Sequence, residues 1–533
     1  MAEFKTMLGK ARPSANLLVE KGEMNGTTLP ITKHQIIIGR DFGTADIVVT
    51  DPLVSRRHAR ISWIATQYII EDLESSNGTI MNGKLLATSH LLESGDRIDL
   101  GQTTLLFQQL DENEAQGEPI IDHTYVAKLP KPKDIDSVPA RMILDMATQA
   151  NRRLGHENLG FLSEEYGFLP ASPPPLNLPS GYEVWDEMAE RLPDLWRAIR
   201  VRQELQTMPV LSADKADLPD EYLLRASVIM SILAHAYHRI SDNPPDKPMP
   251  DGVQLPWEQI SRRLDRLAPH LSYIDLILYN WQLIDPNLAD DPFQINNLEL
   301  LVSTVDNQEE KVLYLMQVEA HYKIGPITGA MVRAQEAVYH DNVEALKKEL
   351  IFITDGLQQF GNKIFMALNP NPYSDTFVDP VVWAKTVAPF AVPITEGTVG
   401  PSGVSAPLFH MLDVFFGRHH YNTHLGEEML NMRNWYPKHW QDFFEALGEI
   451  SVAEYVEKRN DPILDGIYKE AAMGYAGDSG FLTVHKIKAY GYLDIAFKVG
   501  RSVTIGGFSG LFKDRVWDAA VDELAYSQDE RVS

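Results

Sequence analysis

The sequence predicts two folds in one chain, an all-β sandwich followed by a mostly α-helical region. Up to about residue 110, short β-branched runs alternate with Gly, Asp and Asn turns. A polar, acidic run with the composition of a linker occupies residues 111–119. Beyond it, long segments repeat apolar residues at three- and four-residue steps, as amphipathic and buried helices do. A chain of 533 residues is also long enough for two or more domains.

The strands of the first region are expected where β-branched residues cluster. Runs about five residues long at this spacing are typical of a small sandwich. The expected strands are Gln35–Gly39, Ile47–Val49, Tyr68–Ile70 and Thr103–Phe107.

The helices of the second region are expected where the apolar period is closest to that of an α-helix. They are Tyr222–Arg239, Tyr273–Trp281, Glu310–Tyr339, Val343–Leu368, Leu408–Phe416 and His439–Leu447. Proline-rich breaks occur at Pro173–Pro179, Pro244–Pro250 and Pro370–Pro380. We divide the chain into an N-terminal tail (1–15), the sandwich (16–110), a linker (111–125) and the helical region (126–533).

Composition excludes several classes of protein. The chain has 48 Lys and Arg against 74 Asp and Glu, so its net charge of −26 opposes non-specific binding to nucleic acid and to anionic membranes. Cysteine is absent, which excludes disulfides, thiolate metal sites and cysteine nucleophiles. No apolar stretch reaches the roughly 18–20 residues that span a bilayer. We expect a soluble cytoplasmic protein with neither a nucleic-acid nor a membrane partner.

Four short stretches in the β region gather residues that suit a phosphate. They are Gly39–Arg40, Ser55–His58, Ser75–Thr79 and Asn82–Gly83. Each alone has an ordinary interpretation, such as a hairpin turn, a solvated charge or a buried histidine. Together they supply arginine, hydroxyl and amide donors from separate loops at one end of a sandwich, which is the mixture that a phosphate needs.

In this order and spacing the stretches resemble the forkhead-associated (FHA) domain, a phosphothreonine-binding β-sandwich, over about residues 16–110. The resemblance implies a phosphopeptide contacted by Arg40, Ser55, Ser76 and Asn77, with Arg56 beside the phosphate. It implies a structural role for Gly39, His58, Gly78, Thr79 and Asn82. The implied partner is a protein that carries phosphothreonine.

The helical region offers few chemical motifs. It contains no defensible hydrolytic triad, no Gly-rich phosphate loop and no HExxH metal motif. His419, His420 and His424 are close in sequence, but adjacent histidines in a polar stretch are usually solvated and not metal ligands. His485 lies in an expected helix, Phe481–Tyr490, and a histidine on a buried helix can place Nε2 on a haem iron. Alone, such a histidine is more often a core or surface residue.

Residues from about 120 to 530 resemble the indoleamine 2,3-dioxygenase family. The matching stretches, in order, are Glu165–Pro170, Leu192–Leu195, Asn280–Trp281, Asp285–Asn287, Val318–Glu319, Gly400–Ser405, Leu412–Val414, Met432–Arg433 and Ser451–Val456. The resemblance implies a large helical part (about 256–533) that holds haem b and a smaller part (about 126–255) that covers its distal side. The axial ligand of the haem iron falls on His485. The family's acidic residue near the cofactor falls on Asp413, although its arginine partner three residues before the ligand is missing.

Other positions depart from family members that oxidise tryptophan. The position of a small hydroxyl residue over the iron is Leu315. The family holds the substrate carboxylate with an arginine, yet no arginine occurs from 334 to 417, and the nearest cation, Lys385, lacks the bidentate fork. The distal loop keeps Ser402 and Gly403 but has lost an amide. The loop after the ligand keeps glycines at 506, 507 and 510, with Thr504 and Ser509 as its nearest hydroxyls.

The leading interpretation is a haem-dependent dioxygenase of the indole 2,3-dioxygenase type, targeted or regulated by the FHA module. It would use dioxygen and an indole or related aromatic substrate, with Leu315, Ser402 and Gly403 in the distal pocket. The missing clamp favours an indole without the carboxylate over free tryptophan. Three alternatives stay open: a family relative with another aromatic oxygenation or rearrangement, a non-catalytic haem- or ligand-binding effector, and a haem-free scaffold.

Overall fold

Alternating burial along short strands builds the N-terminal region. In β1 (Ala15–Lys21), Ala15, Leu17 and Val19 are buried and the residues between them are half-buried, as expected for a strand with one face on a core. The other strands are β2 (Thr28–Pro30), β3 (Gln35–Gly39), β4 (Ile47–Val48), β5 (Ala59–Ile64), β6 (Gln67–Asp72), β7 (Thr79–Met81), β8 (Lys84–Leu85), β9 (His90–Leu91), β10 (Arg97–Leu100) and β11 (Thr103–Gln109). The four strands expected from the sequence correspond to β3, β4, β6 and β11.

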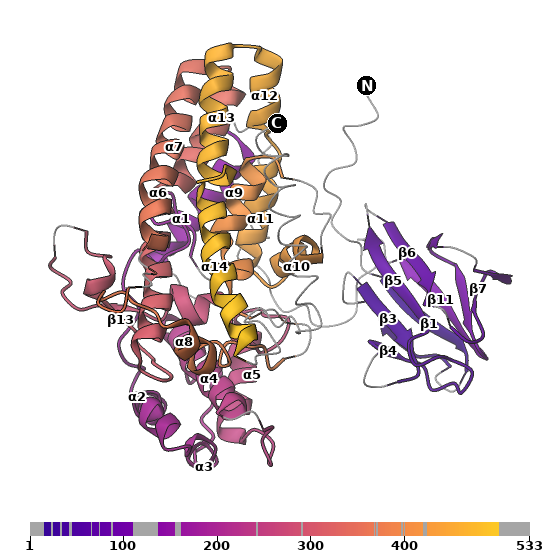
Figure 1. Cartoon of the computed structure of the whole chain (residues 1–533). Coiled ribbons are helices and arrows are strands. Elements are labelled where there is room, and N and C mark those ends of the chain that lie inside the picture. Colours follow the sequence, from indigo (N-terminus) through magenta and orange to yellow (C-terminus); the bar gives the residue numbers. More distant parts are fainter. Residues whose placement is uncertain are drawn as a thin grey trace. The chain divides into compact units, whose positions relative to one another are not determined.

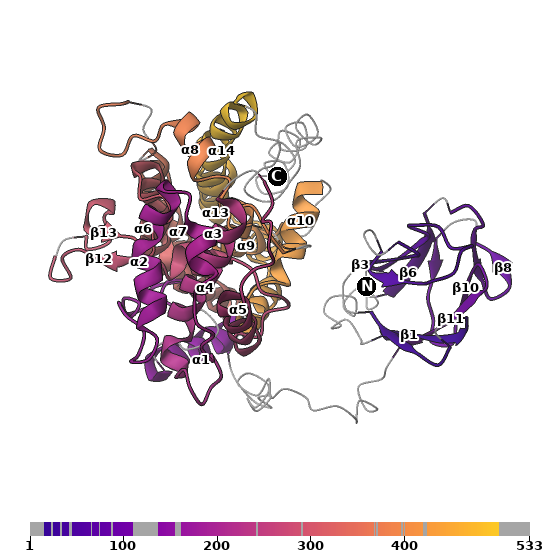
Figure 2. The same ribbon diagram turned by 90° about the horizontal axis from the view of Figure 1, so that it is seen from below.

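These strands form two sheets with a shared core. One sheet has the order β2-β1-β11-β10-β7-β8 and the other the order β4-β3-β5-β6-β9 (Figure 2). Leu17 pairs with Phe107 across β1 and β11, and Ile61 with Ile70 across β5 and β6. These side chains and their neighbours make one buried cluster, so the predicted sandwich is confirmed.

The structure is a computed structural model of the full chain. It describes residues 15–22, 25–31, 35–41, 45–64, 67–73, 75–86, 89–109, 137–154, 161–240, 243–288, 291–366, 368, 371–395, 398, 400–418 and 424–499. The chain divides into two units, Met1–Pro130 and Lys131–Ser533, which are described separately below as the β unit and the helical unit. The predicted linker lies outside the described residues.

The helical unit is mostly α, as predicted. Its helices are α1 (Pro139–Leu154), α2 (Glu183–Arg197), α3 (Val201–Leu205), α4 (Leu223–Arg239), α5 (Asp251–Arg263), α6 (Gln308–Tyr339), α7 (Val343–Met366), α8 (Pro380–Thr386), α9 (Pro407–Phe415), α10 (His424–Arg433), α11 (Lys438–Gly448), α12 (Val452–Arg459), α13 (Pro462–Ala476) and α14 (Phe481–Lys498). Short elements between them are η2 (Asp220–Tyr222), η3 (Ile274–Leu278), β12 (Gln282–Leu283), η4 (Ile295–Asn297), β13 (Leu298–Glu299) and η5 (Gly403–Ser405). Within the described ranges, no helix is both long and apolar enough to cross a bilayer.

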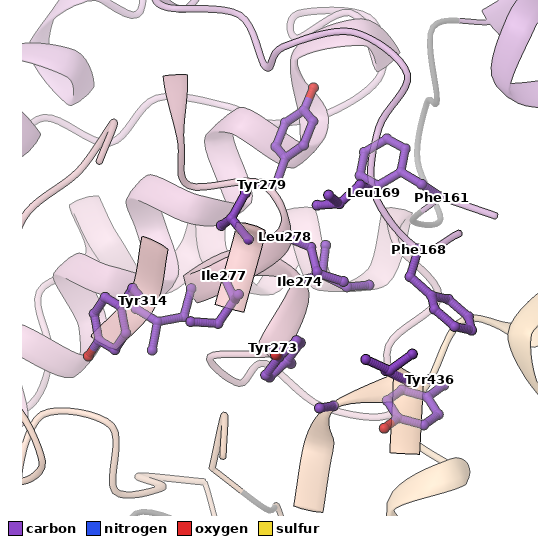
Figure 3. Packing of buried hydrophobic residues seen from close by; sticks show 14 of the residues in the cluster. Phe161, Phe168, Leu169, Tyr273, Ile274, Ile277, Leu278, Tyr279, Tyr314 and Tyr436 are labelled. Atoms are coloured by element: carbon purple, nitrogen blue, oxygen red, sulfur yellow. The ribbon is translucent and has the colours of Figure 1, made fainter. Parts of the chain in front are cut away.

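Long helices lying side by side form the frame of this unit. Helices α6 and α7 pack along each other, and α13 and α14 lie against α7 (Figure 1). One buried hydrophobic cluster contains residues between Val138 and Ala496. It therefore includes residues on both sides of the predicted border between the smaller and the larger part, at residues 255/256. Aromatic side chains from residues 161–168, from the region of η3 and from the turn before α11 meet in this core (Figure 3). Among them, Phe161 stacks on Tyr279 at 5.3 Å between ring centroids.

One expected helix has a different form. The segment predicted as Tyr273–Trp281 is a single π-helical turn, η3, in which the amide of Tyr279 donates to the carbonyl of Ile274 at 2.9 Å. Its Asp275 is fully buried and accepts hydrogen bonds from Ser227 of α4 and from Arg266. These anchors fix the wide turn, and tertiary contact therefore overrides the apolar period here.

Candidate functional site

The predicted phosphate-binding residues of the β unit lie on loops that hydrogen bonds connect. The amide of Arg40, directly after β3, donates to the carbonyl of Ser55 at 3.1 Å. The Ser55 hydroxyl accepts from the amide of Ser76 at 3.0 Å. The Asn77 side chain donates to the carbonyl of Leu53 at 2.7 Å. Residues from three separate stretches of sequence thus come together, as the motif predicts.

A buried histidine, His58, connects these loops through hydrogen bonds. The Nδ1 atom of His58 accepts from the amide of Ser55 at 3.0 Å, which leaves the proton on Nε2, and Nε2 lies 3.2 Å from the carbonyl oxygen of Gly78. Gly39 is equally constrained, because a Cβ there would lie 2.1 Å from the carbonyl oxygen of Arg56. Both residues therefore have structural roles, in agreement with what the resemblance implies for them.

Asp72 and Asn82 brace the neighbouring turns. Asp72 accepts from the hydroxyl of Thr79 at 2.6 Å and from the amide of Ser75 at 2.8 Å. Burial alone raises the pKa of Asp72, but these hydrogen bonds outweigh it, and the net pKa is lowered. Asn82, in the left-handed region at φ 49°, donates to Asp96 at 2.8 Å and accepts from the amide of Arg97 at 2.9 Å.

The charged tips of the β-unit site face outward. Arg40 and Arg56 are exposed, and neither forms an ion pair with any residue that the structure describes. Ser76 and Asn77 are exposed as well, and Ser55 is half-buried. The loops that these hydrogen bonds connect therefore carry two exposed arginines together with hydroxyl and amide groups, the kinds of donor that suit a phosphate ester.

In the helical unit, His485 lies half-buried in the second turn of α14. Its imidazole packs against Phe409 of α9, with ring centroids 4.6 Å apart and planes at 37°. Burial and the nearby charge of Lys486 lower the pKa of His485 to about 4. The imidazole is therefore neutral at physiological pH, which is the form that binds a metal.

Gly403 lies directly against the edge of this imidazole. A Cβ built on Gly403 would be 2.6 Å from Cε1 and 2.8 Å from Nε2 of His485. Only glycine keeps that edge clear of a side chain, so the donor chemistry and the cradle fit a haem iron on Nε2. The backbone of Gly403 is itself close, so haem held at Nε2 would need more space than this arrangement of the loop leaves.

The loop that carries Gly403 has its own internal bonds. The amide of Ser402 donates to the carbonyl of Gly400 at 2.8 Å, and the hydroxyl of Ser405 donates to the same carbonyl at 2.7 Å. The hydroxyl of Ser402 is buried and has no hydrogen-bond partner among the described residues. The structure thus brings Ser402 and Gly403 to His485, whereas Leu315 lies on the buried face of α6.

Asp413 has an arginine partner that the sequence did not reveal. Asp413 is 1 % exposed and accepts from Arg418 at 3.2 Å and from the hydroxyl of Tyr475 at 2.7 Å. The arginine expected three residues before His485 is Leu482 here, and the cation comes instead from the turn after α9. The resemblance places the arginine before His485, whereas Arg418 follows Asp413 by five residues and its amide also donates to the Asp413 carbonyl at 2.9 Å.

The other candidate cations and histidines have different partners. Lys311 pairs with Asp306 at 2.8 Å, and Lys385 is exposed on α8. Two other histidines, His321 and His235, are buried, and they lie within hydrogen-bonding distance of the Tyr273 hydroxyl and the Phe390 carbonyl, respectively. His419, His420 and the loop after residue 500 lie outside the described residues. Within the described ranges, no group of three or more metal-ligating side chains occurs.

Comparison with known proteins identifies both parts. Residues 36–101 match the model of the FHA domain, and residues 161–391 match the model of indoleamine 2,3-dioxygenase. The chain is 27% identical to mouse indoleamine 2,3-dioxygenase 1 over 345 residues, which cover 61% of this chain and 82% of that protein. It is 27% identical to human indoleamine 2,3-dioxygenase 2 over 336 residues, covering 59% of this chain and 79% of that protein.

The β unit has its own relatives. It is 29% identical over 103 residues to FHA domain-containing protein FhaB of Mycobacterium tuberculosis, which covers 19% of this chain and 66% of that protein. The resemblances inferred from the sequence are therefore confirmed, and the chain joins an FHA domain to an indoleamine 2,3-dioxygenase-like region. The FHA match contains all five predicted phosphate contacts, whereas the other match contains Leu315 but ends before Ser402, Gly403, Asp413 and His485.

Proposed function

We propose that this protein is a haem-dependent oxygenase that acts on an indole or related aromatic molecule and is targeted or regulated by phosphothreonine binding. The observation that carries the first half is the neutral imidazole of His485 with Gly403 against its Nε2 edge. The mouse and human relatives named above are dioxygenases, which supports the same reaction class. When bound, haem would supply the dioxygen-activating redox chemistry.

The residues of this chain have distinct tasks in that proposal. His485 holds the iron through Nε2, and Phe409 packs on its imidazole and so fixes the orientation of the ring. Asp413, with Arg418 and Tyr475, anchors α9 to the end of α13, and α9 carries Phe409. Ser402 and Gly403 form the wall beside the ligand, and Leu315 contributes an apolar surface from α6.

Expression with added haem tests the cofactor first. The full chain should purify with one haem per protein and the Soret band of a histidine-ligated iron. His485→Ala should lose the haem, or bind it with an altered spectrum that external imidazole restores. The matched control is His235→Ala, which removes a different histidine, one buried beside the Phe390 carbonyl, and should keep the haem. Full haem with an unchanged ferrous spectrum in His485→Ala would move the ligand to another residue.

Turnover separates this proposal from its main competitor. A non-catalytic haem- or ligand-binding effector is favoured by one observation, namely that Lys385, the cation nearest to the expected carboxylate clamp, is exposed, while Lys311 is paired with Asp306. Under dioxygen and a reductant, an enzyme should convert at least one member of a panel of indoles. Haem binding without any product would select the effector.

The β unit would supply the phosphothreonine site. Its support is the exposed cluster of Arg40, Ser55, Arg56, Ser76 and Asn77 on braced loops. Calorimetry should show binding of phosphothreonine peptides and none of the same peptides without phosphate. Equal binding of both forms would contradict this part while leaving the oxygenase proposal intact.

A further inference from the structure

A buried histidine of α9 holds the loop that lies against His485. His410 is 0 % exposed, and its Nε2 atom lies 2.8 Å from the carbonyl oxygen of Val404. Val404 is the next residue after Gly403, and both belong to η5. The side chain of His410 therefore reaches back six residues to the turn that precedes its own helix.

Arg433 determines which nitrogen of His410 carries the proton. The Nε atom of Arg433, at the end of α10, donates to Nδ1 of His410 at 3.3 Å. A guanidinium is always charged and can only donate, so Nδ1 must accept. The proton of the neutral imidazole is then on Nε2, where it is donated to Val404. Burial and the charge of Arg433 lower the pKa of His410 to about 3, which keeps the ring neutral.

Aromatic packing fixes the orientation of this imidazole. The ring of Tyr436 lies 5.2 Å from it at 89°, and the ring of Phe444 lies 6.2 Å from it at 27°. Rotation of the His410 side chain would break both its hydrogen bonds and these contacts. A series of hydrogen-bonded groups thus leads from Arg433 through His410 to the Val404 carbonyl.

This series of hydrogen bonds leads to the loop that lies against the edge of His485. Two amide hydrogen bonds close η5, from Ser405 to the Ser402 carbonyl at 2.9 Å and from Ala406 to the Gly403 carbonyl at 3.2 Å. Gly403 lies between the two anchored carbonyls of Gly400 and Val404. Any displacement of Val404 therefore changes the gap between the Gly403 backbone and Nε2 of His485.

We propose that His410 is a positioning residue for the His485 site: its bond to Val404, oriented by Arg433, sets the distance of the Ser402–Ser405 wall from the ligand nitrogen. This rests on the proposed function, because the distance matters to catalysis only if Nε2 binds the haem iron. His410 does not touch the reacting atoms and acts through the loop.

Three variants of the full chain test it. His410→Leu removes the hydrogen bonds and keeps an apolar side chain, whereas His410→Gln can donate to Val404 and accept from Arg433. His235→Leu removes a comparable buried histidine, whose Nδ1 lies 3.0 Å from the Phe390 carbonyl, and controls for general loss of stability. The two readouts are hydrogen exchange of the Ser405 and Ala406 amides and the rate of haem transfer to an apo-globin in excess.

In His410→Leu we expect the two amides to exchange at least tenfold faster and haem to leave at least fivefold faster than in the wild type. His410→Gln should stay within twofold of the wild type in both readouts, and His235→Leu should leave the two amides unchanged. Unchanged exchange in His410→Leu, or equal acceleration in His410→Gln or His235→Leu, would overturn the proposal. If the wild type binds no haem, the proposed function fails, but the exchange data still decide whether His410 holds the loop.

Discussion

The two candidate sites are built in opposite ways. In the β unit, the groups that would meet a ligand include two exposed, charged arginines, and hydrogen bonds to His58 and Asp72 hold the neighbouring loops. In the helical unit, the proposed ligand nitrogen is covered by the backbone of Gly403, and the supporting groups are buried side chains. The first proposed site is exposed to solvent as it stands, whereas the second would have to open before it could hold a large cofactor.

Acid should destabilise the helical unit far more than the β unit, and this is the largest effect we expect. Burial lowers the pKa of His235, His321 and His410 to about 3, from 6.5 when unfolded. The unfolded chain takes up protons that the folded helical unit excludes. Each histidine therefore contributes stability that is complete above pH 6.5 and is lost as the pH falls toward 3, by up to about 1.4 kcal/mol per pH unit.

The β unit should resist the same acid. The pKa values of Asp51, Asp72 and Asp96 are lowered because hydrogen bonds outweigh burial, so their contribution is lost only below about pH 3.8. Pepsin digestion at pH 4.5, with fragments identified by mass, should cut beyond residue 130 and spare residues 15–109. Cleavage of both units at this pH would contradict the expected difference in acid stability between them.

The second prediction concerns buried against exposed ion pairs. Asp413→Ala leaves the guanidinium of Arg418, itself 3 % exposed, without its carboxylate and should destabilise the helical unit by about 3–5 kcal/mol. Tyr475→Phe removes one hydrogen bond to the same carboxylate and should cost about 1.5–3 kcal/mol. Denaturant unfolding followed by tryptophan fluorescence measures both, since eight of the nine tryptophans lie beyond residue 130.

The control for that prediction lies in the β unit. Glu20 and Arg97 form an exposed ion pair at 2.7 Å, and Glu20→Ala should leave the stability of the β unit nearly unchanged. A small effect of Asp413→Ala would mean that the buried charge finds another partner, and the contrast between the two units would then disappear.

The residues of the β-unit site could be predicted from the sequence more fully than the contacts of the helical-unit site. The predicted phosphate-binding residues are adjacent in sequence to turns, and a turn is fixed by local chemistry such as the left-handed Asn82 and Gly78. The contacts in the helical unit join residues far apart: Gly403 meets His485 across 82 positions of sequence, and Tyr475 meets Asp413 across 62. Spacing carries no information about such pairs.

The fold shows the same limit. Strand β3 and helix α14 follow their local patterns, and both were predicted. Helices α2 and α5, which contain Pro193 and Pro256, were not predicted, although α6, which was predicted, also contains a proline, Pro326. The π-turn at Ile274–Leu278 depends on the buried anchors of Asp275, which no periodicity reveals.

The third prediction tests the readiness of the exposed site. Charge-assisted hydrogen bonds to phosphate are worth roughly 1.5–3 kcal/mol each. Arg40→Ala should therefore weaken phosphothreonine-peptide binding at least tenfold, with the sandwich still folded by circular dichroism. Arg97→Ala, which removes another exposed arginine of the β unit, is the matched control and should bind like the wild type. Equal affinity of Arg40→Ala and the wild type would remove the role assigned to Arg40.

The last and smallest effect concerns which ligand the closed site accepts. No arginine occurs from 334 to 417, Lys311 is paired with Asp306 at 2.8 Å, and Lys385 is exposed. A carboxylate buried beside the haem would therefore be poorly paired, which costs about 1–3 kcal/mol even when compensation is partial. Tryptamine differs from L-tryptophan only in lacking that carboxylate, so it should shift the Soret band at a several-fold lower concentration.

Kinetics give the opposing outcome. Conversion of L-tryptophan to N-formylkynurenine with kcat/KM of about 10⁴ M⁻¹s⁻¹ or more, in the range of ordinary enzymes, would contradict the preference for an indole without a carboxylate. The variants Lys311→Met and Lys385→Met would then identify the cation. Only replacement of the lysine that holds the carboxylate should raise KM for L-tryptophan while leaving tryptamine binding unchanged. Such a result would also show that the helical site rearranges its cations on opening, whereas the β unit presents its cations on the surface beforehand.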